Sequence, residues 1–184
     1  MQTIARKGKL VLKDGSVYEG ELYGKRNAVG EVVFTTGMSG YQETLTDPSF
    51  CGQIVVMTYP LVGNYGTNDL FNQGRKSFFQ GYVISELCDH PSNWRCEKTL
   101  EQFLDEQDVP VLTGVDTRAI TRKLRNYGVL QGVIVPAEMP QEEVEKLLAT
   151  PEVHDQVATV TTPEIYTLGN GKYHVAVSYT HLRA

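Results

Sequence analysis

The 184-residue sequence lacks an excess of positive charge and has no long apolar run. Its 17 Lys and Arg residues stand against 22 Asp and Glu residues, which gives a net charge of −5. This acidic balance argues against nucleic-acid binding as the main role of the chain. No stretch approaches the roughly 18 apolar residues of a membrane span, so we expect no membrane partner. Apolar residues, at 41% of the chain, are still numerous enough for a globular core.

The sequence is also poor in cysteine, and its three cysteines form no CxxC pair. An odd number without paired spacing excludes a disulfide framework and favours a reducing, cytoplasmic location. The N-terminal segment MQTIARKGKLVL has only a three-residue apolar run before Lys13, so we expect no signal peptide. These absences predict a cytoplasmic globular domain and leave its chemistry open.

The first third of the chain is predicted to be rich in β-strands. The pair Asp14-Gly15, a strong hairpin-turn signal, separates the expected strands Lys9–Leu12 and Val17–Gly20. Two further β-branched runs, Glu31–Thr35 and Gln53–Tyr59, have the composition of strands buried on both faces.

A glycine-containing polar segment, residues 35–50, connects these two runs. Tyr41 and Leu45 are spaced as on one helix face, and Pro48 ends any helix that contains them. We therefore predict a turn, about one and a half turns of helix, and a second turn.

The second half is predicted to alternate strands and helices. The expected strands are Tyr82–Leu87, Val109–Leu112 and Val129–Val135. Three helices are expected, each with an apolar stripe. The first runs from Asn93 to Gln107 and carries Leu100, Phe103 and Leu104. The second is capped by Asp116, carries Ile120, Leu124 and Tyr127 and is closed by Gly128, and the third is opened by Pro140 and carries Val144, Leu147 and Leu148. The expected fold class is α/β, with a β-rich first half and an alternating β-α second half.

Domain boundaries follow from a loss of pattern after the last predicted helix. Residues 1–149 are expected to form one domain, and residues 150–172, which contain prolines and threonines without a sustained period, a linker. Tyr173–Val177 has the pattern of the opening strand of a second domain. A strand needs a neighbour for its backbone groups, so we expect that second domain to be cut short.

The cysteines offer the first candidates for chemistry. Cys96 is the best of them, because we expect it in the first turn of a helix, where the helix N-terminus lowers a thiol pKa. No catalytic signature surrounds Cys96, Cys51 or Cys88, so inert cysteines are the commoner interpretation. Cys88, His90 and Cys96 could also bind a metal, but a zinc site usually needs a second close pair of ligands. An ordinary polar loop remains the favoured alternative.

Two glycine motifs also stop short of a known site. Gly37-x-x-Gly40 and Gly63-x-x-Gly66 lack both the GK[ST] of a P-loop and the full GxGxxG of a dinucleotide site. Tight turns explain both motifs without a phosphate.

Carboxylates and serines complete the search for a reaction. Glu43 and Asp47 could share a helix face as paired catalytic acids, although solvated acids beside a turn are more common. Ser39 and Ser49 lie outside any GxSxG elbow. The residues alone thus show no complete active site, which indicates a binding partner or part of a larger enzyme.

Three segments together resemble one enzyme family. Residues 30–68, GEVVFTTGMSGYQETLTDPSFCGQIVVMTYPLVGNYGTN, are similar to the signature stretch of the small subunit of glutamine-hydrolysing carbamoyl phosphate synthetase. The hairpin LVLKDGSVYEG fits the start of that family, and residues 114–125, GVDTRAITRKLR, fit its GVDTRxLTRxLR segment. The resemblance extends over residues 8–177.

The resemblance implies a subunit of two domains. This chain would contain the N-terminal one, a swivelling β/β/α domain that packs against the large subunit. The other would be a class I glutamine amidotransferase, whose Cys–His–Glu set releases ammonia from L-glutamine. The ammonia would pass through a tunnel to the large subunit and react there with bicarbonate activated by ATP and Mg²⁺, for arginine and pyrimidine synthesis. The family thus implies a heterodimer in which ATP and Mg²⁺ bind to the partner large subunit and no cofactor or metal binds to this domain.

One site residue carries over from the family to this chain. Ser49, in the motif Asp47-Pro48-Ser49, would contact L-glutamine across the domain interface. A turn after Pro48 can present a hydroxyl to the polar end of an amino acid. The alternative is a hydroxyl that caps its own turn.

The end of the sequence departs from the family pattern. After Val177, where the family has an Asp-(Tyr/Phe)-Gly-x-Lys stretch, residues 178–184 read SYTHLRA. The positions of the catalytic Cys, His and Glu are then missing, so we assign no catalytic residue and expect the chain alone to be inactive. We expect a truncated or frameshifted reading of the gene with a foreign tail. The alternatives are a stand-alone, non-catalytic binding or regulatory module for the large subunit and, more remotely, an independent thiol or hydrolase enzyme.

Overall fold

A hairpin at the start of the chain confirms the first sequence prediction. The computed structural model describes residues 5–151 and 155–176, and its first strands are β1 (Arg6–Leu12) and β2 (Val17–Tyr23). They pair antiparallel around the Asp14-Gly15 turn, in which the Asp14 carboxylate accepts a hydrogen bond from the Ser16 N–H at 3.0 Å. A short polar side chain followed by glycine is what such a turn requires.

Seven of the described strands close into a barrel in the order β1-β2-β8-β6-β4-β3-β9. Besides the hairpin they are β3 (Ala28–Thr35), β4 (Gln53–Met57), β6 (Gly81–Val83), β8 (Val111–Thr113) and β9 (Leu130–Pro136). The pairs β3–β4, β4–β6 and β6–β8 are parallel, and the other pairs are antiparallel. The α/β class and the alternating second half are therefore confirmed, whereas closure of the sheet into a barrel was not predicted.

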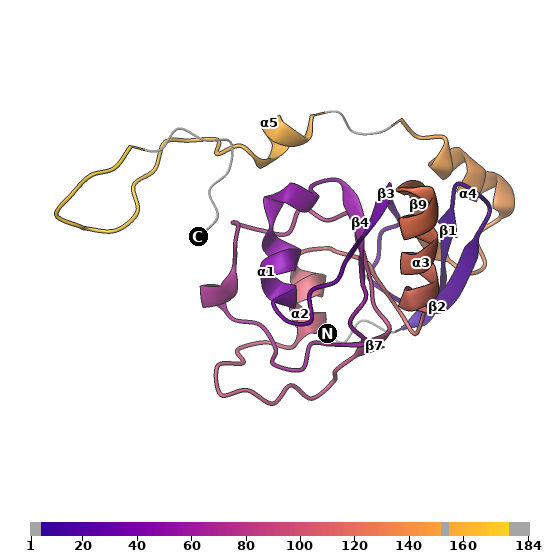
Figure 1. Ribbon diagram of the computed structural model, residues 1–184, viewed down its shortest axis with the longest axis horizontal. Helices are drawn as coiled ribbons and strands as arrows, with labels where there is room; N and C mark the ends of the chain where they lie inside the picture. Colours follow the sequence, from indigo (N-terminus) through magenta and orange to yellow (C-terminus); the bar gives the residue numbers. More distant parts are fainter. Residues whose placement is uncertain (1–4, 152–154, 177–184) are drawn as a thin grey trace.

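Helices cover the barrel on several sides. They are α1 (Tyr41–Thr46), α2 (Leu100–Glu106), α3 (Thr117–Tyr127) and α4 (Gln141–Leu148). In Figure 1, α1 and α2 lie together on the left, α3 lies in front of the strands and α4 lies near the β1–β2 hairpin. The strands thus have a second buried face.

Strand β4 shows this burial on both faces directly. Ile54 and Val56 belong to the apolar cluster inside the barrel, which α3 extends with Ile120. Val55 and Met57 point the other way, into the cluster that α1 and α2 share. The period of two along a strand separates the two clusters, and the predicted two-sided burial is confirmed for β4. In the other expected run, Glu31–Thr35, only Val32 is buried.

Helix α3 begins and ends where the sequence predicts. The Asp116 carboxylate accepts a hydrogen bond from the Ala119 N–H at 2.8 Å, and the Gly128 N–H donates to the Leu124 carbonyl. The prediction that Tyr127 belongs to the buried stripe is wrong. Its side chain is 75% exposed, and the ring lies beside the Lys123 ammonium at the end of the helix.

The expected strand Tyr82–Leu87 is in fact two strands with different partners. Strand β6 lies in the barrel, whereas β7 (Glu86–Leu87) pairs with β5 (Leu61–Val62) in a separate two-stranded sheet. Backbone pairing changes sides within this stretch, since the Ile84 N–H donates to Leu112 and the Glu86 N–H to Pro60. An apolar pattern carries no information on such a change of partner.

The second predicted helix begins later than expected. Thr99 and Gln102 form a capping box, in which each side chain accepts a hydrogen bond from the backbone N–H of the other, so α2 begins at Leu100. Cys96 therefore lies in the preceding turn and not in a first helical turn. Strand β8 likewise begins at Val111, after Pro110, which has no N–H to donate.

The segment predicted as a linker contains one short helix, α5 (Gln156–Val160). The predicted strand Tyr173–Val177 is not formed over residues 173–176, where Tyr173 and Val175 are exposed. Val177 and the predicted tail 178–184 lie outside the described residues. No neighbouring strand meets residues 173–176 in the described chain, which explains why the apolar pattern alone forms no strand there.

Candidate functional site

The candidate site is the turn that connects α1 to β4. Gly40 precedes the helix with φ 75°, a left-handed conformation that glycine adopts without strain. The helix runs for six residues to Thr46, and Asp47 is its C-cap, just before Pro48 as predicted. Pro48 then opens a single 3₁₀ turn, Pro48–Phe50, which leads into β4.

Ser49 lies at the exposed tip of this 3₁₀ turn. The Asp47 carboxylate caps the turn by accepting a hydrogen bond from the Ser49 backbone N–H at 2.9 Å. Pro48 beside it is buried. Asp47 therefore caps this 3₁₀ turn, and Ser49 lies on an anchored, exposed turn.

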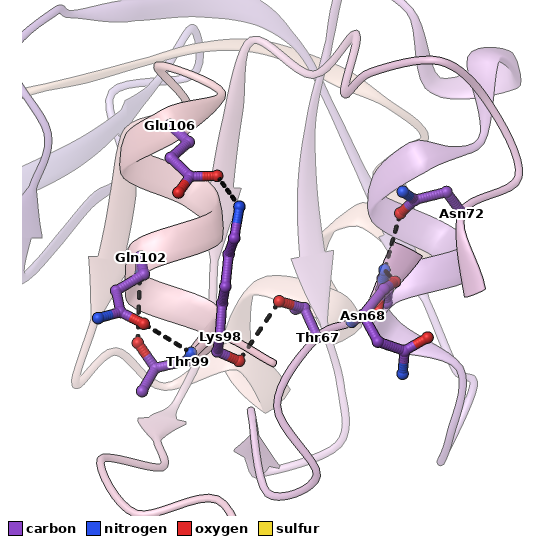
Figure 2. A network of polar contacts seen from close by, with 8 residues as sticks. Thr67, Asn68, Asn72, Lys98, Thr99, Gln102 and Glu106 are labelled. Atoms are coloured by element: carbon purple, nitrogen blue, oxygen red, sulfur yellow. Dashed lines mark hydrogen bonds and ion pairs between the residues drawn. The ribbon is translucent and has the colours of Figure 1, made fainter. Parts of the chain in front are cut away.

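A buried polar network joins the helix before this turn to residues 68–73. Gln42, which is fully buried, accepts a hydrogen bond from the Asn68 N–H at 3.0 Å and donates to the Asn72 side chain at 2.7 Å. The Thr46 hydroxyl accepts a hydrogen bond from the Gln73 N–H at 2.8 Å. Figure 2 shows Asn68 and Asn72 on the side of the network that faces α1. Residues 68–73 are thereby fixed to the helix that precedes Ser49.

A glycine allows the closest approach between these two segments. A Cβ atom on Gly74 would lie 2.6 Å from the Thr46 carbonyl oxygen and 3.1 Å from the Pro48 ring. Only a residue without a side chain fits there. The backbone after the network therefore packs directly against the Pro48 turn.

Two stacked tyrosines hold the other end of α1. The rings of Tyr41 and Tyr65 lie 4.1 Å apart, and the Tyr65 hydroxyl accepts a hydrogen bond from the Tyr41 N–H. The Tyr41 hydroxyl donates to the Gly66 carbonyl at 2.6 Å. Burial raises the pKa of both phenols, so neither is an acid or base near neutral pH.

Helix α5 approaches the candidate turn from the far end of the chain. The Gln156 side chain lies 3.8 Å from the Cβ position of Gly52, three residues after Ser49. The Arg75 guanidinium donates hydrogen bonds to the carbonyls of Thr159 and Thr161 at 3.3 and 3.4 Å. In Figure 1 the chain after α5 extends away from the barrel as an open loop.

The other sequence candidates do not assemble into a catalytic or metal site. No group of three or more Cys, His, Asp or Glu side chains with metal-binding geometry occurs among residues 5–151 and 155–176. The Cys96 thiol contacts the Lys98 carbonyl, and burial raises the pKa of the Cys51 thiol, which disfavours its thiolate. The structure thus brings Cys88, His90 and Cys96 together in no ligand set within its described part.

The remaining motifs have structural explanations. The Gly66 N–H donates to the Gly63 carbonyl, so this glycine motif is the predicted tight turn. Glu43 and Asp47 are not a catalytic pair: Asp47 caps the 3₁₀ turn beyond the helix, while Glu43 points back toward Gly40. The exposed Ser39 lies in the preceding loop.

Sequence reasoning missed the supporting network rather than the turn. The buried polar residues Gln42, Thr46 and Asn68 carry no motif, because each has a hydrogen-bond partner distant along the chain. The capping pair Thr99 and Gln102 could have been found, since Thr-x-x-Gln before an apolar helix is a recognised signal.

A hollow elsewhere on the surface does not include the candidate turn. It is lined by residues of β2, β7, α2 and β8 and their flanks: Tyr23, Gly24, Leu87, Glu101, Leu104, Asp105, Val109 and Val111. We find no helix long and apolar enough to cross a membrane in the described parts of the chain.

Comparisons with known proteins agree with the resemblance noted in the sequence. The family described as "Carbamoyl-phosphate synthase small chain, CPSase domain" matches residues 10–134. The carbamoyl phosphate synthase pyrimidine-specific small chain of Halalkalibacterium halodurans is 47% identical over 176 residues, which cover 94% of this chain and 49% of that relative. The corresponding Bacillus subtilis protein is 46% identical over 94% of this chain and 48% of its own length.

A third relative matches a shorter stretch more closely. The carbamoyl phosphate synthase small chain of Caldanaerobacter subterraneus is 54% identical over 140 residues, which cover 76% of this chain and 39% of that relative. The chain thus spans about half the length of the curated relatives that it matches over nearly its whole length. Together with the match over residues 10–134, these identities show that the chain belongs to the family of carbamoyl phosphate synthase small chains.

Proposed function

We propose that this chain is the N-terminal part of the glutaminase subunit of a glutamine-hydrolysing carbamoyl phosphate synthetase. The observation that carries the proposal is membership of the small-chain family over residues 10–134. A small chain implies a large chain as its partner, and this domain would pack against it. Residues 1–149 would form this domain, 150–172 a linker, and the chain from Tyr173 would begin an amidotransferase domain.

In this proposal the domain also completes the glutamine site with Ser49. Support comes from the geometry of the turn: Ser49 is exposed, while its turn is anchored by Asp47 and by the buried Pro48. A hydroxyl on an anchored turn can bind a polar ligand at little cost in conformational entropy. In this proposal Ser49 binds the substrate and does not attack it.

The path of the chain is consistent with a glutamine site between two domains. Helix α5 lies against Gly52 and Arg75, so the chain leaves the barrel domain near the Ser49 turn. A domain attached there would begin within reach of that turn.

The remaining chemistry belongs, in this proposal, to other parts of the enzyme. The amidotransferase domain would hydrolyse L-glutamine with its Cys–His–Glu set, and ATP and Mg²⁺ would bind to the large chain, which makes carbamoyl phosphate from bicarbonate and ammonia. Residues 1–184 alone would then be inactive. Two relatives are named pyrimidine-specific, which favours pyrimidine synthesis over arginine synthesis. The proposed location of the enzyme is the cytoplasm.

Reconstitution of the enzyme tests this function. The full-length small chain that contains this domain is mixed with the large chain from the same genome, and carbamoyl phosphate is measured with glutamine or ammonia as nitrogen source. We expect glutamine-driven synthesis only when both chains are present, and no glutaminase activity from residues 1–184. Glutaminase activity of residues 1–184 alone, or failure of the two full-length chains to associate, would refute the proposal.

A further inference from the structure

Helix α3 presents a stripe of three arginines to solvent. Arg118, Arg122 and Arg125 are all exposed, while Ile120 and Leu124 of the same helix are buried in the barrel cluster. At 100° per residue, these positions fall within a sector of about 60°, and their Cα atoms span roughly 10 Å along the axis. We refer to Arg118, Arg122 and Arg125 as the arginine stripe.

The arginine stripe is unpaired within the described chain. The basic residues that form ion pairs there are Lys7, Arg26, Lys98 and Lys123, each with an Asp or Glu. Within residues 5–151 and 155–176, no carboxylate lies within ion-pair distance of the arginine stripe. This is notable in a chain of net charge −5, where acidic partners outnumber basic ones.

The neighbouring Lys123 shows what pairing on this helix looks like. Its ammonium donates to the Asp14 carboxylate and to the Ser16 hydroxyl, and so ties α3 to the β1–β2 turn. Lys123 points to the other side of the helix from the arginine stripe. The structural attachment of α3 therefore uses Lys123 and the apolar face and leaves the arginine stripe available.

Figure 1 shows α3 at the front of the barrel, with no other element lying in front of it. Arginine is suited to carboxylates, because its planar guanidinium donates two parallel hydrogen bonds to them. Three such groups on one rigid helix form an array that matches a row of acidic side chains on a partner surface. The acidic charge of the whole chain disfavours nucleic acid as that partner.

We propose that the arginine stripe of α3 is a docking surface for an acidic patch on the large chain. This inference rests on the proposed function, which supplies the large chain as partner. The charges steer the encounter of the two chains and fix the orientation of the barrel domain on the large chain. A row of rim charges acts mainly on the association rate and its salt dependence.

The test compares two variants of the full-length small chain that lose the same charge. In the first, Arg118→Gln, Arg122→Gln and Arg125→Gln remove the arginine stripe with residues that keep helix propensity. In the matched control, Lys13→Gln, Lys25→Gln and Lys146→Gln remove three exposed cations elsewhere on the domain. Thermal unfolding of both variants should match the parent, because none of the six side chains has a partner in the described chain.

Binding to the large chain is then measured by surface plasmon resonance between 50 and 500 mM NaCl. We expect the arginine-stripe variant to bind roughly ten- to a hundredfold more weakly at low salt, mainly through slower association, with a flatter dependence on salt. The control variant should stay within about twofold of the parent.

Three other outcomes would overturn the inference. Equal loss in both variants would mean a general charge effect, and no loss in either would mean that the arginine stripe faces solvent in the complex. A shift in self-association of the small chain, seen by sedimentation with the arginine-stripe variant alone, would assign the surface to a second copy. Failure of the parent chain itself to bind would instead refute the proposed function.

Discussion

The side-chain amide of Gln42 pairs with both backbone groups of Asn68, 26 residues further along the chain. Its oxygen accepts a hydrogen bond from the Asn68 N–H at 3.0 Å, and its nitrogen donates to the Asn68 carbonyl. The buried Gln42 side chain thus makes the two backbone hydrogen bonds with Asn68 that a neighbouring strand would otherwise make. The arrangement fixes the loop after β5 to the helix that leads into the Ser49 turn.

Replacement of Gln42 by leucine should therefore be strongly destabilising. Gln42→Leu keeps the size of the side chain but leaves a buried N–H and a buried carbonyl without partners, at about 1–3 kcal/mol for each group. We expect a loss of about 3 kcal/mol in the free energy of unfolding, measured by urea denaturation. Gln141→Leu on the exposed side of α4 is the control and should change stability by less than about 0.5 kcal/mol. Equal effects of the two variants would contradict the role assigned to Gln42.

Arg26 lies in the turn between β2 and β3 and joins it to two distant segments. Its guanidinium donates hydrogen bonds to the carbonyls of Asp108 and Phe79, at 2.7 and 3.2 Å, and to the Gln80 side chain at 3.2 Å. Lysine is a point donor that cannot reproduce this fork, so Arg26→Lys should lower stability by about 1–2 kcal/mol. Chemical denaturation measures the loss. Lys25→Arg, at the exposed neighbouring position, is the control and should leave stability unchanged. A stable Arg26→Lys variant would show that charge alone suffices.

Helix α2 depends on its capping box. Thr99 and Gln102 satisfy each other's backbone N–H groups, as Figure 2 shows beside the Lys98–Glu106 pair. Thr99→Ala should reduce stability by about 1 kcal/mol, whereas Thr99→Ser keeps the accepting hydroxyl and should cost much less. The difference between these two variants in thermal unfolding is the measurement. No difference would mean that the cap is not needed to start α2.

The link between α3 and the first hairpin should depend on pH. The hydrogen bond from Lys123 lowers the pKa of Asp14 below its ordinary value of about 3.9. A lowered pKa in the folded state adds stability above the unfolded value, and this stability is lost as pH falls through the folded value. The stability gap between the parent and Asp14→Asn should thus be full at neutral pH and shrink as the pH falls through the lowered pKa of Asp14. A gap that does not change with pH would exclude the ionic contribution.

Local signals in the sequence predicted much of this fold. Asp14-Gly15, Asp116 and Gly128 act within a few residues of their own position, so the hairpin and both ends of α3 follow from them. The two-sided burial of β4 follows in the same way from its run of β-branched residues.

Features that depend on distant partners could not be predicted. The stretch Tyr82–Leu87 changes partner from β8 to β5, and closure of the barrel depends on β1 meeting β9. The buried Gln42 has no local signature, since its partners lie on a later loop. The turn of Ser49 was predicted because Pro48 marks it, whereas its support was not.

The kinetic role of Ser49 tests the account most directly. In the complex of the full-length small chain with the large chain, Ser49→Ala should raise the glutamine KM about fivefold, which corresponds to the net worth of one hydrogen bond, about 1 kcal/mol. Ammonia-driven synthesis should be unchanged, because it bypasses the glutamine site. Ser92→Ala, which removes another exposed serine, should leave both reactions unchanged. An unaltered glutamine KM in the Ser49→Ala enzyme would contradict the assignment of this turn to the glutamine site.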